Sequence, residues 1–168
     1  MRISGDPMGR HVMIRTTKFA SWLKAMSRLS TAMQIAAAEE ADVDDVIALW
    51  EVCGLTRPWN DPAADFRLAL ANETSAILLA QIEGALVASV MTGFDGHRGW
   101  VYYLAVAPDF RKHGLGTKMM AAAEHWLRER NAPKIQLMVR DGNEAAIGFY
   151  KALGYDVQPV VTIGRRLD

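Results

Sequence analysis

The sequence contains one cysteine, Cys53, among its 168 residues. A single cysteine forms neither an intrachain disulfide nor a thiolate zinc site, and the apolar residues around Cys53 indicate a small buried side chain. The sequence also lacks an apolar run of about 18 residues, the length that a membrane-spanning helix needs. No His, Cys or carboxylate cluster has metal-ligand spacing, so we expect no metal site. These absences favour a cytoplasmic protein without a membrane span.

An excess of charge of either sign is also missing, because 19 Lys and Arg balance 19 Asp and Glu. The balance is uneven along the chain. Residues 1–32 carry six basic residues and one acidic residue, and residues 33–168 carry the other thirteen basic and eighteen acidic residues, so the net charges are +5 and −5. A dedicated nucleic-acid binder needs a surface that neutralises phosphates. The acidic body therefore predicts no nucleic-acid partner.

The basic N-terminal segment has the pattern of an amphipathic helix. Its apolar residues recur at steps of three and four between Phe19 and Met33. Acidic residues are rare, as in transit peptides and surface-binding helices, but the apolar region of a secretory signal is missing. Three interpretations stay open: an extension without function, a docking helix and a targeting segment. We therefore divide the chain into an extension, 1–32, and a domain, 33–168.

The domain sequence alternates between strand and helix patterns, and its hydrophobic content of 51% excludes wholesale disorder. The expected strands are Gln34–Ala37, Ser75–Ile82, Ala85–Gly93, Trp100–Val106, Lys134–Val139 and a closing pair, Val157–Val161 and Thr162–Arg166. The expected helices run from an Asp42 N-cap to Gly54 and over Ala63–Ala71, Thr117–Arg130 and Asn143–Leu153. This order predicts an α/β fold with a mixed sheet and helices on both faces.

The most informative segment runs from Leu104 to Gly116, where a buried strand passes through a short loop into a helix. Main-chain N–H groups at a helix start have no internal partner, and with the helix dipole they form an anion site. Gly114 and Gly116 let a pyrophosphate approach the backbone, and Arg111 and Lys112 add positive charge. A plain strand-to-helix turn is the alternative. A Walker loop and a dinucleotide fingerprint are excluded, because Gly-Lys-Ser/Thr and a third glycine are missing.

Two motifs resemble those of the GCN5-related N-acetyltransferase (GNAT) superfamily. Motif A is similar to Val106-Ala-Pro-x-Phe-Arg-x-x-Gly-x-Gly116, and motif B is similar to Asn143-Glu-Ala-Ala-Ile-Gly-Phe-Tyr150-Lys-Ala-Leu-Gly154-Tyr. The likeness covers about residues 33–168, and the stretches 57–62 and 94–99 further resemble a bacterial subgroup designated YpeA. It implies a mostly antiparallel sheet with a splayed parallel strand pair. It also implies direct transfer of an acetyl group from acetyl-CoA to a primary amine of a small molecule or protein.

The resemblance assigns roles to individual residues. Strand residues Leu104, Ala105 and Val106 would line the pantetheine arm, and Asn143 would contact it. The pyrophosphate would be held by the loop and helix start, which comprise Arg111, Lys112, His113, Gly114, Leu115, Gly116 and Thr117. Tyr150 would protonate the leaving thiolate, and a main-chain N–H near Val106 would stabilise the oxyanion.

One position departs from the family. Many relatives have a Glu general base where this sequence has Trp100, which cannot accept a proton. The base therefore stays open, and a water chain ending at Asp61, Asp95 or His97 is the alternative. The substrate-contacting candidates are Trp59, Asp61, Asp95 and His97. The missing carboxylate also keeps a second function open, a non-catalytic acyl-CoA-binding sensor or interaction module, and a homodimer is left open as well.

Overall fold

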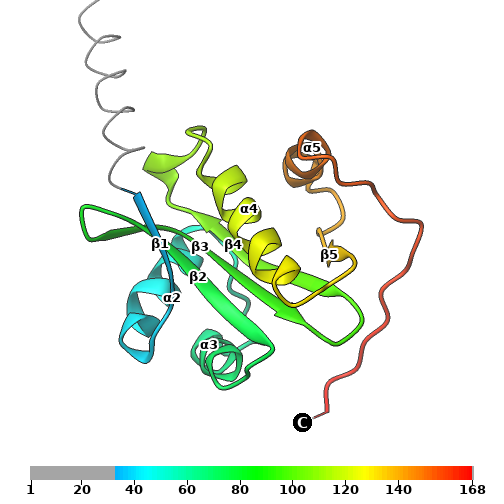
Figure 1. Cartoon of the computed structure of the whole chain (residues 1–168), viewed down its shortest axis with the longest axis horizontal. Helices are drawn as coiled ribbons and strands as arrows, with labels where there is room; N and C mark the ends of the chain where they lie inside the picture. Colours follow the sequence, from blue (N-terminus) through cyan, green and yellow to red (C-terminus); the bar gives the residue numbers. More distant parts are fainter. Residues whose placement is uncertain (1–32, 168) are drawn as a thin grey trace, which may run out of the picture.

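The computed structural model describes residues 33–167, so the predicted N-terminal extension lies outside the described residues (Figure 1). The elements follow one another as β1 (Met33–Ala37), η1 (Glu40–Asp42), α2 (Val43–Val52), α3 (Pro62–Leu70), β2 (Ser75–Ile82), β3 (Ala85–Phe94), β4 (Gly99–Val106), η2 (Pro108–Phe110), α4 (Leu115–Arg128), β5 (Ile135–Leu137) and α5 (Glu144–Ala152). Each helix predicted within the domain 33–168 is present, with its ends shifted by one or two residues.

The described strands form one mixed sheet in the order β1-β2-β3-β4-β5. All neighbours are antiparallel except β4 and β5, which are parallel. Glu83 and Gly84 join β2 to β3 with positive φ angles of 51° and 81°. Two consecutive residues with positive φ make a tight turn whose twist matches that of the two strands of a hairpin. The predicted α/β class and the mostly antiparallel sheet are therefore confirmed.

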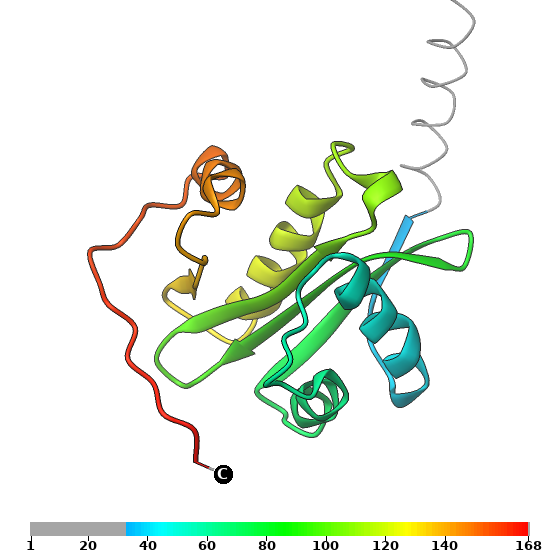
Figure 2. The same ribbon diagram turned by 180° about the vertical axis from the view of Figure 1, so that it is seen from behind.

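Helices cover both faces of this sheet, because alternate residues of its central strands face opposite sides. In β2, Leu78, Ala80 and Ile82 belong to the core beneath α4, whereas Ile77 and Leu79 belong to the core with α2 and α3. Figure 2 shows α2 and α3 in front of the sheet and α4 behind it. This layering leaves the carboxyl end of β4 between the two cores.

Three expectations need correction. The strand predicted over Lys134–Val139 is only Ile135–Leu137, because the chain leaves β4 after Leu137. The closing pair predicted over 157–166 is wrong, since these residues are extended but carry no ladder. Asp42 precedes α2 as expected, but its carboxylate accepts the main-chain N–H of Glu39 at 2.8 Å and caps no helical N–H.

Candidate functional site

Strand β4 is kinked where it leaves its partner. Its pairing with β5 ends at Val101 opposite Leu137, so residues 102–106 have no neighbour on that side. On the other side, the register with β3 shifts between Ser89 and Met91. Tyr103, in this bulge, has a φ of 49°, which is rare for a bulky side chain. The parallel pair therefore splays, and one edge of β4 is left with free main-chain groups.

The unpaired edge leads into the N-terminus of α4. The main-chain N–H groups of residues 112–117 donate to no acceptor within the described part of the chain. Gly114 is the N-cap with a φ of 76°, a conformation that favours glycine, and a Cβ there would meet no atom within 4 Å. The glycine therefore serves the backbone conformation, and the free N–H groups have the arrangement that an anion site needs, while the binding of an anion stays a prediction.

The carbonyl oxygen of Val106 lies at the junction of strand and loop. It accepts hydrogen bonds from Arg111 Nε at 3.1 Å and from Cys53 Sγ at 3.3 Å. A ligand arm that pairs with this carbonyl would share it with these donors. Arg111 and Lys112 are exposed beside the loop, and Leu104 and His113 are partly buried. Two other predicted cofactor residues, Ala105 and Leu115, are buried at 2% and 5% exposure, so their side chains belong to the core.

Helix α5 closes against the start of α4. A Cβ on Gly116 would lie 3.2 Å from the Phe149 ring, so the glycine permits a close approach of the two helices. Asn143 is the N-cap of α5, and its Oδ1 accepts the N–H of Ala146 at 3.1 Å. Its capping role is therefore present, and its contact with a cofactor stays a prediction.

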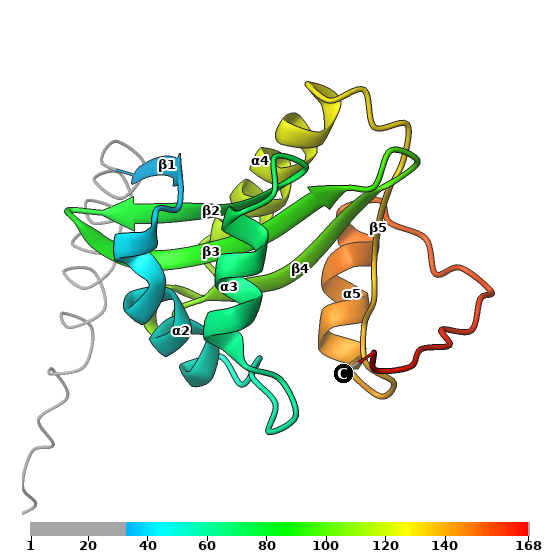
Figure 3. The same ribbon diagram turned by 90° about the horizontal axis from the view of Figure 1, so that it is seen from below.

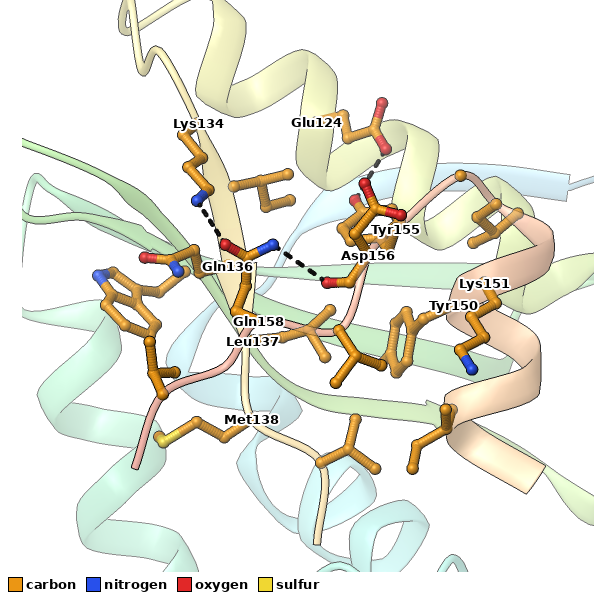
Figure 4. Close-up of a pocket in the computed structure, with 18 of the residues that line it drawn as sticks. Glu124, Lys134, Gln136, Leu137, Met138, Tyr150, Lys151, Tyr155, Asp156 and Gln158 are labelled. Atoms are coloured by element: carbon orange, nitrogen blue, oxygen red, sulfur yellow. Dashed lines mark hydrogen bonds between the residues drawn. The ribbon is translucent and has the colours of Figure 1, made fainter. Parts of the chain in front are cut away.

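Tyr150 lies on α5 and lines a cavity of about 940 Å³ between β5, α5 and the C-terminal segment (Figure 4). Its ring packs edge-on against the rings of Phe149 and Tyr155, with ring centroids 5.1 Å and 5.8 Å apart. Burial raises the pKa of its phenol above 10. The hydroxyl has no hydrogen-bond partner among the described residues. A protonated phenol held this way is equipped to donate a proton.

A second cavity, of about 520 Å³, lies between α3 and the kinked part of β4. Tyr103 donates a hydrogen bond to Asp65 Oδ2 at 2.7 Å, and the Tyr103 ring stacks on buried Trp50 at 4.0 Å. Burial and the hydrogen bond to Asp65 raise the pKa of Tyr103 to about 12. The indole Nε1 of Trp50 in turn donates to Ser89 at 3.0 Å. These contacts with Asp65 and the buried Trp50 thus fix the position of Tyr103 in the bulge.

The charged side chains that line this second cavity are all acidic. Its lining contains two carboxylates, Asp65 and Asp95, and none of its lining residues is Lys, Arg or His. Aromatic side chains of Trp100, Tyr102 and Tyr103 form one wall. Carboxylates beside aromatic faces favour a bound cation.

The predicted substrate residues fall into two groups. Asp95 lines the second cavity, but its carboxylate accepts hydrogen bonds from Arg98 N–H, Trp100 Nε1 and His97 N–H, and these three bonds lower its pKa to about 2. Asp61 instead caps α3 by accepting two main-chain N–H groups. Trp59 and His97 are exposed and line neither cavity. A carboxylate with a pKa near 2 is a poor base, so Asp95 is better suited to hold charge than to take a proton.

Asp65 and Tyr103 were not predicted from the sequence. Asp65 follows Asp61 by four residues, one helical turn, and this spacing on α3 was the available signal. None of the predicted cofactor residues lines the Tyr150 cavity or the Asp65 cavity, whereas Trp100 lines both.

Metal-ligating clusters and membrane-spanning helices are both missing from residues 33–167. No group of three or more His, Cys, Asp or Glu side chains there is placed to hold a metal ion. No helix within residues 33–167 is long and apolar enough to cross a membrane.

Comparisons with known proteins agree with one another. The profile of the "Acetyltransferase (GNAT) family" matches residues 36–155. Acetyltransferase YE1169 of Yersinia enterocolitica is 44% identical over 135 residues, which cover 80% of this chain and 96% of that relative. An aminoglycoside N-acetyltransferase, AAC(6')-Iy in complex with CoA, has a TM-score of 0.70 at 17% identity and matches 81% of this chain and 95% of its own. A ribosomal-protein-alanine N-acetyltransferase from Brucella melitensis has a TM-score of 0.66 at 20% identity, over 80% and 99%. At these identities the two structures show likeness of fold.

Proposed function

Because the chain belongs to the GNAT family of acetyltransferases, we propose that it transfers an acetyl group from acetyl-CoA directly to a primary amine of a cationic acceptor. The two sequence motifs predicted the superfamily correctly, and the protein is an acyltransferase. One observation carries the donor assignment: the unpaired edge of β4 leads straight into the unpaired N–H groups at the start of α4. The extended, amide-bearing pantetheine arm of acetyl-CoA matches the strand edge, and its anionic pyrophosphate matches the N–H groups.

The donor site is formed mainly by the backbone. The edge of β4 from Leu104 to Val106 offers hydrogen bonds to the pantetheine arm, as an added strand would receive. The N–H groups of residues 112–117 and the α4 dipole favour the pyrophosphate, with Arg111 and Lys112 adding charge. A body of net charge −5 needs such local donors to bind an anion. Acetyl-CoA supplies the acyl group as an activated thioester.

The acceptor approaches through the Asp65 cavity. Its carboxylates favour an ammonium group, and its wall includes Tyr102 and Tyr103 at the kink of β4. An amine must be neutral when it attacks, so a group near the kink has to take its proton. Asp65 is placed for this step, because Tyr103 binds its Oδ2 while its Oδ1 accepts no hydrogen bond from the described residues.

The proton donor for the leaving thiolate is Tyr150, which lies on α5 and not in the Asp65 cavity. The Tyr150 phenol stays protonated at neutral pH, since burial raises its pKa. A main-chain N–H near Val106 is the donor for the developing oxyanion. Trp100 replaces the strand carboxylate of many relatives, and this substitution supports the second candidate, an acyl-CoA sensor without turnover. We also propose that the protein acts in a reducing cytoplasm, where Cys53 stays a thiol.

Two measurements test the proposal. Calorimetry should detect acetyl-CoA binding, and thiol detection should register CoA release with a panel of polyamines, aminoglycosides and lysine or N-terminal peptides. Gly114→Glu should abolish binding, because it places a carboxylate among the anion-binding N–H groups. Gly84→Glu is the matched control, since Gly84 has a similar φ of 81° and equally open space in the β2–β3 turn.

The outcomes separate the candidates. No binding of acetyl-CoA would overturn the donor assignment. Binding without release of CoA for any acceptor would favour the sensor. Release with neutral amines alone would contradict the cationic acceptor.

A further inference from the structure

The two cavities lie on opposite sides of strand β4, and Trp100 is the one residue within 33–167 that lines both of them. Figure 3 shows α3 on one side of β4, and β5 with α5 on the other. The Asp65 cavity is on the side of α3, and the Tyr150 cavity is on the side of β5 and α5. The two cavities therefore come together at Trp100.

The strand register places Trp100 in a row of residues that crosses from one cavity to the other. Its partner on β3 is Gly93, and its partner on β5 is Gln136. Gly93 lines only the Asp65 cavity, and Gln136 lines only the Tyr150 cavity. Paired residues of neighbouring strands have their side chains on the same face of the sheet. Because Gly93 has no side chain, the indole of Trp100 is the first large group in this row on the side of the Asp65 cavity.

The Trp100 side chain is held in one position. Its Nε1 donates to Asp95 Oδ2 at 2.9 Å, and its ring is stacked with that of Tyr102, with centroids 6.4 Å apart and planes inclined by 14°. Tyr102 follows Trp100 by two residues, which places both rings on the same face of the strand. The main-chain carbonyl of Trp100 also accepts a hydrogen bond from Thr92 Oγ1 at 3.2 Å. A ring fixed in this way forms a wall.

We propose that Trp100 is a specificity-determining residue, which closes the Asp65 cavity towards the Tyr150 cavity and so limits the length of the acceptor. This inference rests on the proposed function, in which the acceptor amine reaches Asp65 beside Tyr103. Tyr103 follows Trp100 by three residues, so about 10 Å of strand separates the reacting end of the cavity from the wall. A second ammonium group at the far end would lie between the Asp95 carboxylate and the face of the indole. The acceptor class is a compact diamine, in which a short chain joins the two ammonium groups.

The volumes of the two cavities show what the wall controls. The Asp65 cavity, of about 520 Å³, has the size of a small-molecule site. Without the indole it would open into the Tyr150 cavity, of about 940 Å³. A longer diamine would then extend past position 100 into the space beside Gln136. Removal of the indole should therefore change which length of acceptor is preferred.

The preference for diamine length tests the inference. Calorimetry on the protein loaded with CoA compares 1,4-diaminobutane with 1,10-diaminodecane, and because CoA carries no acetyl group, it measures binding without transfer. The wild type should bind the short diamine about tenfold more tightly than the long one, or more, since the wall excludes the long chain. Trp100→Ala should reduce this ratio to about twofold or less by admitting the long chain. A general loss of stability would weaken both diamines alike and leave the ratio unchanged.

Two further variants serve as controls, and circular dichroism should show that each is folded. Trp126→Ala removes an indole from α4 that lines neither cavity, so it should keep the wild-type ratio. Trp100→Phe keeps an aromatic ring but loses the hydrogen bond to Asp95. Its ratio should stay close to that of the wild type, because the ring forms the wall. A ratio for Trp100→Phe equal to that of Trp100→Ala would overturn the wall.

The outcomes keep this inference apart from the proposed reaction. The same ratio in the wild type and in Trp100→Ala would overturn the wall, even where the wild type releases CoA with short diamines. The expected change of ratio in a protein that releases no CoA would support the wall and overturn the transfer. Binding of neither diamine would overturn the wall and the cationic acceptor together.

Discussion

The indole Nε1 of Trp100 donates a hydrogen bond to Asp95 Oδ2 at 2.9 Å. This bond joins the start of β4 to the turn before it, and the same carboxylate accepts two main-chain N–H groups of that turn. Trp100 therefore orients the Asp95 carboxylate in the lining of the Asp65 cavity. At the position where many relatives have a Glu, Trp100 thus donates a hydrogen bond and accepts no proton.

The Asp95 carboxylate makes the free energy of unfolding depend on pH in the acidic range. Its pKa is lowered from 3.8 to about 2 by three hydrogen bonds, those of Arg98, Trp100 and His97. The ionised form stabilises the fold, so its contribution is complete above about pH 4 and is lost as the pH falls through 2. Asp95→Asn should lower the free energy of unfolding above about pH 4, and the difference from wild type should shrink towards pH 2. Urea unfolding across this range measures it, and a constant difference would contradict the assignment.

The contact between Gly116 and Phe149 predicts different stabilities for two glycine substitutions. Gly148 lies within α5 with nothing within 4 Å of its missing Cβ, so Gly148→Ala should stabilise the protein by about 0.5–1 kcal/mol. Gly116→Ala must push the Phe149 ring away, and we expect it to be less stable than Gly148→Ala by about 1 kcal/mol or more. Chemical denaturation compares the two variants. Equal stabilities would mean that the ring yields freely.

Removal of the Tyr150 hydroxyl separates chemistry from binding. Tyr150→Phe should lower kcat about 100-fold and leave the Kd for acetyl-CoA within about twofold, because a proton donor acts in the transition state. Tyr155→Phe is the control: its hydroxyl donates to Glu124 at 2.8 Å, so the variant should lose about 1 kcal/mol of stability but little activity. Equal losses of affinity and kcat in Tyr150→Phe would assign the phenol to binding.

Asp65 should determine which acceptors are used. Asp65→Asn keeps the size of the side chain but removes its charge, so kcat/KM should fall about tenfold or more for dicationic acceptors and less for uncharged amines. Asp61→Asn is the control one turn away, where asparagine caps a helix as well as aspartate does. Steady-state kinetics with both acceptor classes decides the matter. An identical loss for both classes would leave Asp65 as base without a role in recognition.

Much of the fold follows from local patterns. The hairpin at Glu83–Gly84 and the helix ended by Gly54 depend on turn residues that each sequence segment contains. The strand pair predicted over 157–166 was wrong because its valines and isoleucine have strand propensity, while a strand also needs a neighbour with free main-chain groups. Propensity alone does not show where that neighbour comes from.

The candidate site, like the fold, was predictable only where its residues are close together in the sequence. The loop from Arg111 to Gly116 is contiguous in sequence, so its motif was visible. The pair of Asp65 and Tyr103 joins residues 38 positions apart. The left-handed conformation of Tyr103 is set by the bulge and not by its residue type, so no local pattern signals it.

The stacking of Tyr103 on Trp50 has a consequence for how acceptor preference changes. Trp50 belongs to α2 and is fully buried, yet its ring supports the side chain of Tyr103, which lines the Asp65 cavity. A substitution anywhere beneath that indole would therefore tilt Tyr103 without touching a substrate. On the proposed path of the acceptor through this cavity, selection for new acceptors can act on residues in the interior of the protein, which the surface does not reveal.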